Sequence, residues 1–391
     1  MVRKSPRAEA LHSLGLALQK SYLLGPLEND SFTDDLEFAY LAIARTRYFQ
    51  GRESVPKQAA YLGLLDVLDD ERFRNKVRMS REAFAALLIR IEDDAVFRNN
   101  SRCSQAPVRL QLVVALSRFG HSGTGSRIGK IARTWGILEG AVVQYTKRVI
   151  VAICRLAPRV IYWPSEAERK QIKEDIHKKS WFPECVGFVD GTHLPIYQRP
   201  AKKDAEDYFN RKRTYLFNVM IVNDHQKRIR YTTFGHCGSA HDTRVWDSSD
   251  LSTSSERYFT PEEYLLADSG YPNTNHTVCS FKAPLANEPT NAKFNNCIAG
   301  LRVCNEHCIG MLKARFPSLT GLRLVINERT KSLKLAQGWF LACCVLHNLL
   351  LDDGWCDNWT VDDQFAEIAT QPPSAEAYVS VGNGSSARRE E

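Results

Sequence analysis

The stretch Cys185–Ile196, CVGFVDGTHLPI, places an aspartate at the end of an apolar run. The run CVGFV has the composition of a buried strand, and Asp190 and Gly191 follow it at once. A buried carboxylate costs free energy unless a cation or several hydrogen-bond donors satisfy it. The sequence therefore predicts that a cationic partner, from the chain or from solution, faces Asp190.

The composition of the 391-residue chain is that of an ordinary globular protein. Hydrophobic residues make up 43% and charged residues 25%, which is enough apolar material for one large core or two modest ones. No apolar run is long enough to cross a membrane, and the start of the chain lacks the sustained apolar core of a signal peptide. We therefore expect an intracellular protein without a membrane segment.

The eleven cysteines do not have the spacing of a disulfide scaffold. In a chain of this length they are expected to be reduced and mostly buried. Two sets of potential zinc ligands are spaced by about one helical turn, namely Cys304 with Cys308 and Cys343 or Cys344 with His347. Buried thiols are the simpler interpretation, and a zinc site is the alternative.

Charge is distributed unevenly along the chain, whose net charge is +7. Residues 98–160 contain eleven Lys and Arg against the single acid Glu139, whereas residues 351–391 contain nine acids and two arginines. A concentrated basic segment favours a polyanionic partner, most commonly nucleic acid. The acidic end, rich in Pro, Ser and Gly, predicts a disordered tail. Two ordinary solvated surfaces are the alternative.

The basic segment has the pattern of short helices. Pro107 is expected to begin a helix that runs through Phe119, and the stretch GHSGTGS interrupts it. Ser126 is a candidate N-cap for a second helix, and a third follows the turn GILEG. Two short helices joined by a glycine-containing turn fit a helix-turn-helix, with a basic helical bundle as the alternative.

The third helix of this segment carries the best candidates for DNA contact. Gln144, Lys147 and Arg148 share its polar face, which suits contacts to phosphates and base edges. Arg127 and Lys130, around the second helix, are further candidates for phosphate contact.

From about Trp181 the pattern changes from helices to strands. Tyr215–Val222 and Ile229–His236 read as strands joined by a polar hairpin turn, and EYLLADSGYP reads as a short strand that ends in Asp268. A helix around Glu306 and the long apolar helix in LKLAQGWFLACCVLHNLLL follow. This order predicts an α+β domain.

Three carboxylates in this order suggest a metal site. Ribonuclease-H-like nucleases place one aspartate on a central strand, a second on a neighbouring strand and a glutamate on a covering helix; here these would be Asp190, Asp268 and Glu306. Clustered carboxylates repel one another without a cation, and hard cations such as Mg²⁺ or Mn²⁺ prefer oxygen ligands. Two such ions about 3.5–4 Å apart can activate a water or a 3′-hydroxyl for phosphoryl displacement.

Several independent motifs then identify a family that the chain resembles. They occur in the order FVDGTHLPI, YFNRKRTYLFNVMIV, GSAHDTRVW, LLADSGYP, VCNEHCIGMLKARFPSL and ACCVLHNLL, and span roughly residues 107–350 together with the basic helices. This set resembles the PIF/Harbinger-type DDE transposases and the domesticated nucleases derived from them. The resemblance implies a ribonuclease-H-like fold with Asp190, Asp268 and Glu306 as catalytic metal ligands.

The same resemblance adds two positions and shows one departure. Asp242 in GSAHDTRVW matches an acidic position associated with the metal site, and Arg211 in YFNRK matches a stretch near DNA. Asn305 departs from the family pattern, in which a small apolar residue usually precedes the glutamate.

The resulting prediction divides the chain into an N-terminal helical region (1–100), a helix-turn-helix DNA-binding region (101–165), a DDE nuclease domain (180–350) and an acidic tail (352–391). By resemblance, the protein would cleave DNA and transfer strands at transposon ends in the nucleus. A Myb/SANT-like DNA-binding protein and a second copy of the chain are the implied partners. The alternative is a domesticated DNA-binding or scaffold protein without catalytic turnover.

Overall fold

A computed structural model of the protein describes residues 6–23, 30–46, 61–100, 104–210, 213–328 and 330–353. The chain forms two compact units, residues 1–56 and residues 57–391. Most of the predicted acidic tail lies outside the described residues, as does Arg211. The domain boundaries proposed from the sequence stay predictions.

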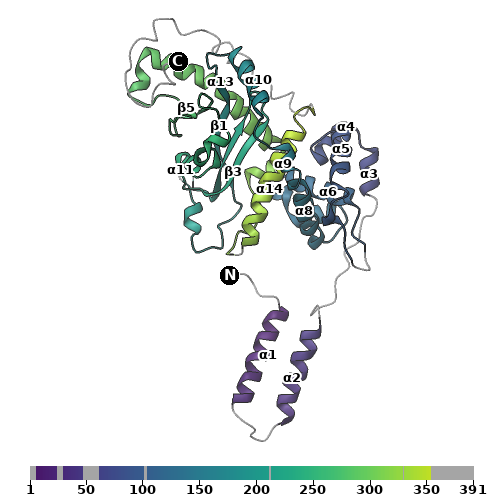
Figure 1. Ribbon diagram of the computed structural model, residues 1–391. Helices are drawn as coiled ribbons and strands as arrows, with labels where there is room; N and C mark the ends of the chain where they lie inside the picture. The colour runs from purple at the N-terminus through teal and green to yellow at the C-terminus, as the bar shows by residue number, and fades with distance from the viewer. Residues whose placement is uncertain are drawn as a thin grey trace. The chain divides into compact units, whose positions relative to one another are not determined.

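The first unit contains an antiparallel pair of helices, α1 (Pro6–Leu23) and α2 (Asp30–Arg45) (Figure 1). The Arg7 guanidinium donates hydrogen bonds to backbone carbonyls at the end of α2, including Ala44 at 2.8 Å and Ile43 at 3.2 Å. The last carbonyls of a helix have no intrahelical donor, and an arginine near them is stabilising. One side chain thus joins the start of α1 to the end of α2.

The second unit begins with short helices: α3 (Tyr61–Val67), α4 (Asp70–Val77), α5 (Arg81–Ile91), α6 (Val108–Phe119), α7 (Ile128–Thr134), α8 (Glu139–Cys154), α9 (Ala157–Val160) and α10 (Glu166–His177). Pro107 precedes α6, as predicted. The Ser126 prediction is wrong: its hydroxyl donates to the Gly123 carbonyl within a 3₁₀ turn, and α7 has no side-chain cap. Helices α7 and α8 pack on each other and on α6, and their assignment as a helix-turn-helix stays a prediction.

A five-stranded sheet follows, with the strand order β3-β2-β1-β4-β5. Its strands are β1 (Cys185–Pro195), β2 (Leu216–Asn223), β3 (Ile229–Cys237), β4 (Tyr264–Ala267) and β5 (Thr277–Cys279). The three strands β1, β2 and β3 are antiparallel neighbours, whereas β4 runs parallel to β1 and β5 parallel to β4. The prediction of a mixed helix-and-sheet domain is confirmed. Strand β5, with three residues, was not predicted.

Strand β1 does not end at Asp190, as the sequence suggested, because only one of its two neighbours ends there. Its pairing with β4 stops at Val189, opposite Ala267. Its pairing with β2 continues from Asp190 to Pro195. Asp190 therefore lies where the sheet opens on one side, next to the residue that follows β4.

Four helices complete the unit: α11 (Asp242–Asp247), α12 (Asp250–Thr253), α13 (Pro289–Arg315) and α14 (Thr330–Leu349). Helix α13 packs on β1, β2 and β4. It contains the helix predicted around Glu306, but it begins much earlier, at Pro289. The polar first turns of α13 have no apolar period to reveal them, although Pro289 occupies a typical first helical position.

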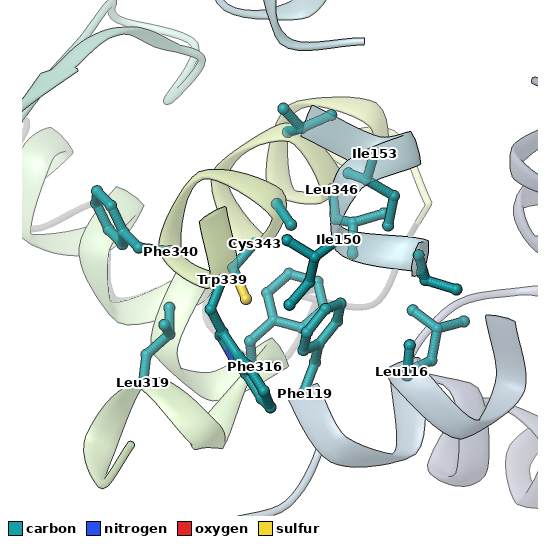
Figure 2. Packing of buried hydrophobic residues seen from close by; sticks show 14 of the residues in the cluster. Leu116, Phe119, Ile150, Ile153, Phe316, Leu319, Trp339, Phe340, Cys343 and Leu346 are labelled. Atoms are coloured by element: carbon teal, nitrogen blue, oxygen red, sulfur yellow. The ribbon is translucent and has the colours of Figure 1, made fainter. Parts of the chain in front are cut away.

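Helices α6, α8 and α14 share one apolar core with the end of α13 (Figure 2). Phe119 packs edge-on against Trp339, with ring centroids 5.0 Å apart, and also contacts Phe316. A Cβ at Gly338 would lie 2.9 Å from Ile150 Cγ2, so this glycine allows α14 to approach α8 closely. The helices before the sheet are therefore packed into the same body as those after it.

The described cysteines are free thiols. Cys308 Sγ lies 3.6 Å from His347 Nε2, and burial raises the pKa values of Cys308 and Cys344. No cluster of three or more potential metal ligands occurs in the described part of the chain. The burial of Cys308, Cys343, Cys344 and His347 supports the interpretation as buried core residues.

Candidate active site

Two aspartates lie side by side where β1 and β4 part. Each carboxylate accepts a hydrogen bond from the next backbone amide, Gly191 N to Asp190 at 2.8 Å and Ser269 N to Asp268 at 2.7 Å. The Arg302 guanidinium on α13 bridges them, with nitrogen–oxygen distances of 3.0 Å to Asp190 and 3.5 Å to Asp268. In this structure the cationic partner of Asp190 is therefore Arg302, which the sequence analysis did not identify.

Asp242, the first residue of α11, approaches the same place from a third direction. Its Oδ1 accepts a hydrogen bond from Asn218 on β2 at 3.2 Å. A Cβ at Gly191 would lie 2.5 Å from that oxygen, and one at Gly270 would lie 3.3 Å from Oδ2. The two glycines that follow Asp190 and Asp268 thus make room for the Asp242 carboxylate.

The three aspartates affect one another electrostatically. Burial raises the pKa of Asp190 to about 6, Arg302 opposes this shift, and the charges of Asp268 and Asp242 add to it. The pKa of the buried Tyr271 phenol is also raised, first by burial and then by the same carboxylates. Its hydroxyl has no hydrogen-bond partner among the described residues. The position of Tyr271 in ADSGYP, three residues after Asp268, was the signal that could have identified it.

Glu306 lies one turn beyond Arg302 on α13, and its side chain is exposed. Its neighbour Asn305 is fully buried, and its Nδ2 donates to the carbonyls of Phe188 at 3.1 Å and Ile221 at 3.3 Å. Asn305 thereby ties α13 to both β1 and β2 and fixes its rotation about its axis. The structure brings Asp190, Asp242 and Asp268 together, and the role of Glu306 stays a prediction.

An open cleft adjoins the aspartates. It has a volume of about 460 Å³ and is lined by residues that include Gly191, Thr192, His193, Asp242 and Lys313. A second hollow of about 340 Å³, which also reaches Asp242, continues beside it. Asp242 therefore borders both hollows, and Gly191, the residue after Asp190, lines the first of them.

The predicted DNA-binding residues have different environments. Gln144 and Lys147 are exposed on α8, and Arg127 and Lys130 are exposed at the start of α7. Arg148 is half-buried, and its Nη1 donates to Gln111 Oε1 on α6 at 3.5 Å. Four of the five described candidates are thus on the surface, and their role in DNA binding stays a prediction.

Comparison with known protein families indicates the class of protein that this chain resembles. Residues 189–348 match the family model of the DDE superfamily endonucleases. The match begins next to Asp190 and ends near the end of α14, so it covers the sheet from Val189 onward together with α13. This part of the chain is therefore similar to DDE-type endonuclease domains. No solved structure matches the chain.

Individual relatives narrow the class. HARBI1 of Rattus norvegicus, described as a candidate nuclease, is 25% identical over 80% of this chain and 86% of its own. HARBI1 of Homo sapiens shows the same identity and coverage, and a protein named ALP1-like from Arabidopsis thaliana is 23% identical over 76% of this chain and 74% of its own. The resemblance to Harbinger-type DDE nucleases and transposases, domesticated members included, is confirmed.

Proposed function

We propose that this protein is a divalent-metal-dependent DNA endonuclease. The observation that carries the proposal is that Asp190 and Asp268 share the Arg302 guanidinium where β1 and β4 part, while Asp242 lies beside Gly191 and borders an open cleft. The strand order β3-β2-β1-β4-β5, with Asp190 on the central strand, supports a ribonuclease-H-like nuclease. The match to DDE superfamily endonucleases supports DNA as the substrate.

In this structure the described residues hold no group of three His, Cys, Asp or Glu side chains arranged to bind a metal ion, and Arg302 lies between Asp190 and Asp268. The residue types nevertheless suit a hard cation, because all three aspartate side chains offer carboxylate oxygens and the charges of Asp268 and Asp242 raise the pKa of Asp190. Mg²⁺ or Mn²⁺ bound here would polarise a phosphoryl oxygen and lower the pKa of a bound water. Within the chain, Asn218 orients Asp242, and the backbone amides after Asp190 and Asp268 orient those carboxylates. Glu306 is proposed as a further ligand, which requires its exposed side chain to turn toward Asp190.

The finer parts of the proposal concern DNA binding and the overall reaction. Lys147, Arg148, Arg127 and Lys130 are proposed to bind phosphates, with Gln144 reading a base edge. Strand transfer at transposon ends, a nuclear location, a Myb/SANT-like partner and self-association are carried only by the family resemblance. In the described part of the chain, none of the helices is long and apolar enough to span a membrane.

The test uses the purified full chain and a supercoiled plasmid. Wild type is expected to nick or linearise the plasmid with Mg²⁺ or Mn²⁺ and to leave it uncleaved with EDTA. Asp268→Asn should be inactive, whereas the matched control Glu262→Gln, an exposed acid just before β4, should cleave normally. Absence of cleavage under all metal conditions would contradict the proposal. DNA binding without cleavage would then favour a binding or scaffold protein, a function consistent with the exposed position of Glu306.

A further inference from the structure

The helix pair α1–α2 belongs to the first unit, takes no part in the site described above, and has no core of its own. Among its residues whose burial is described, none is buried. Folds of fewer than about 40 residues usually need disulfides, metals or oligomerisation to be stable. Residues 1–56 contain no cysteine, so a disulfide is excluded within this unit. The helix pair therefore needs a further surface to pack against.

Helix α2 has two faces that carry apolar side chains, and the first of them packs against α1. Its half-buried members are spaced by three or four residues, namely Thr33, Leu36, Tyr40 and Ile43. Thr33 Oγ1 lies 2.7 Å from Ser21 Oγ on α1, and a Cβ at Gly15 of α1 would lie 3.9 Å from the Tyr40 ring. These contacts show which side of α2 is already used within the unit.

The second face of α2 is exposed. It consists of Asp34, Phe38, Leu41 and Arg45, which follow one another at intervals of four, three and four residues. Phe38 is 76% exposed and Leu41 is 48% exposed. This spacing is that of the a and d positions of a coiled-coil heptad, which line one seam against another helix. The two apolar residues thus lie in the middle of a seam that has a charge of opposite sign at each end.

The order of residues along this seam is self-complementary. A second copy of α2 can be placed antiparallel so that Phe38 of each copy meets Leu41 of the other. In the same register, Asp34 of each copy lies opposite Arg45 of the other. Two opposite-charge pairs then flank two apolar pairs, as a two-fold symmetric interface requires. A parallel arrangement would instead place each charge opposite its own kind.

We propose that the face of α2 formed by Asp34, Phe38, Leu41 and Arg45 binds a second copy of the chain in antiparallel orientation. Two α1–α2 pairs would then associate as a four-helix bundle, which supplies the apolar partner surface that a two-helix unit lacks. The inference goes beyond the proposed function and does not depend on it, because this contact needs neither DNA nor metal. A small interface of this kind gives a weak, concentration-dependent dimer.

The experiment measures the molecular mass of the full chain by sedimentation velocity over a wide range of concentrations, without DNA or metal. Wild type is expected to show an equilibrium between monomer and dimer. Phe38→Ala should raise the Kd of the dimer about 100-fold, because a symmetric interface loses two rings at once. Val67→Ala, which changes a similarly exposed apolar residue on α3, is the matched control and should leave the Kd unchanged.

Two charge reversals test the register. Asp34→Arg and Arg45→Asp each place like charges opposite one another, so each should raise the Kd about ten-fold or more when measured alone. The double variant restores both opposite-charge pairs and should dimerise as wild type does. An equimolar mixture of the two single variants should also recover, by forming a heterodimer. Recovery in the mixture requires contact between copies, so a role of these side chains within their own helix would not produce it.

Three results would overturn the inference. A wild type that is monomeric at every concentration would mean that another part of the chain or a different partner covers this face. A dimer that Phe38→Ala does not weaken would place the interface elsewhere. Charge reversals that do not recover in the mixture would make Asp34 and Arg45 supports of α2 itself. None of these results bears on plasmid cleavage, which tests the proposed function separately.

Discussion

Two cations on one helix, Arg302 and Lys313, face the same strand but contact different kinds of groups. Arg302 bridges Asp190 and Asp268, whereas Lys313, about three turns further along α13, faces a hydroxyl and a carbonyl. Carboxylates neutralise the first cation, whereas the contacts of the second within the described residues are to neutral acceptors. The difference separates a cation that holds two acids together from one that joins α13 to β1.

The largest expected effect comes from removing the acids that hold Arg302. Asp190→Asn and Asp268→Asn should each reduce cleavage by at least about 10³-fold, because a carboxylate that organises transition-state charge is lost. The melting temperature should change by only a few degrees, since Arg302 keeps the other aspartate. Single-turnover cleavage with Mn²⁺ and thermal melts check this. Undiminished cleavage by either variant would remove that residue from the site.

His347 adds a third case to the comparison, a buried base whose neutral form is favoured by the fold. It is buried on α14, its Nε2 lies 2.9 Å from the Lys227 carbonyl, and burial lowers its pKa to about 4. As pH falls through 6.5 toward 4, the unfolded chain takes up a proton that the native state refuses, so stability is lost in that window. The loss should be on the order of 3 kcal/mol.

Urea unfolding between pH 7.5 and 4.5 measures this loss. His347→Gln should flatten the pH dependence, whereas His177→Gln, an exposed histidine at the end of α10, should leave it unchanged. Equal pH dependence in wild type and His347→Gln would show that other groups cause acid destabilisation.

A smaller effect is expected from Arg302 itself. A metal ion at Asp190 and Asp268 has to compete with the guanidinium, so Arg302→Gln should bind Mn²⁺ more tightly, by up to about ten-fold for a coupling near 1.4 kcal/mol. Without metal the variant should melt at a lower temperature, because two acids lose their cation. Isothermal titration of the full chain measures the affinity, with exposed Arg257→Gln as the control. Weaker Mn²⁺ binding would mean that Arg302 supports the metal rather than competes with it.

On α8, far along the chain from either cation, the expected effects are confined to DNA binding. Lys147→Ala and Arg148→Ala should each lower the salt slope of DNA binding by about one and weaken binding to all sequences. Gln144→Ala should weaken binding mainly to one preferred sequence, by about 1–3 kcal/mol if it reads a base. Anisotropy titrations with several duplexes decide this. If Lys147→Ala and Arg148→Ala both bind DNA as wild type does, α8 has a structural role and does not contact DNA.

Asp190 and Asp268 were visible in the sequence because each follows a short apolar run and precedes a small residue, Gly191 or Ser269. That pattern is local and survives without knowledge of the fold. Arg302 and Lys313 were not visible, because their contacts depend on the rotation of α13 about its axis. Asn305 fixes that rotation through two carbonyls on different strands, a long-range constraint that no helical period encodes.

Other parts of the fold were hidden for related reasons. The continuation of β1 past Asp190 depends on β2 as a partner, and the apolar pattern has already ended there. Ser126 has the residue type of a cap, but its hydroxyl bonds within the preceding turn instead. The exposed position of Glu306 likewise follows from tertiary contacts of its neighbour.

Gly338 bears on whether the second unit can be divided into smaller folding units. Because this glycine brings α14 against Ile150 on α8, the helices upstream of the sheet share their apolar core with α14. A truncated protein that lacks either these helices or α14 would expose part of that core to water. A substitution that loosens α8 is expected to loosen α14 as well, so the two helices would have to change together over evolutionary time.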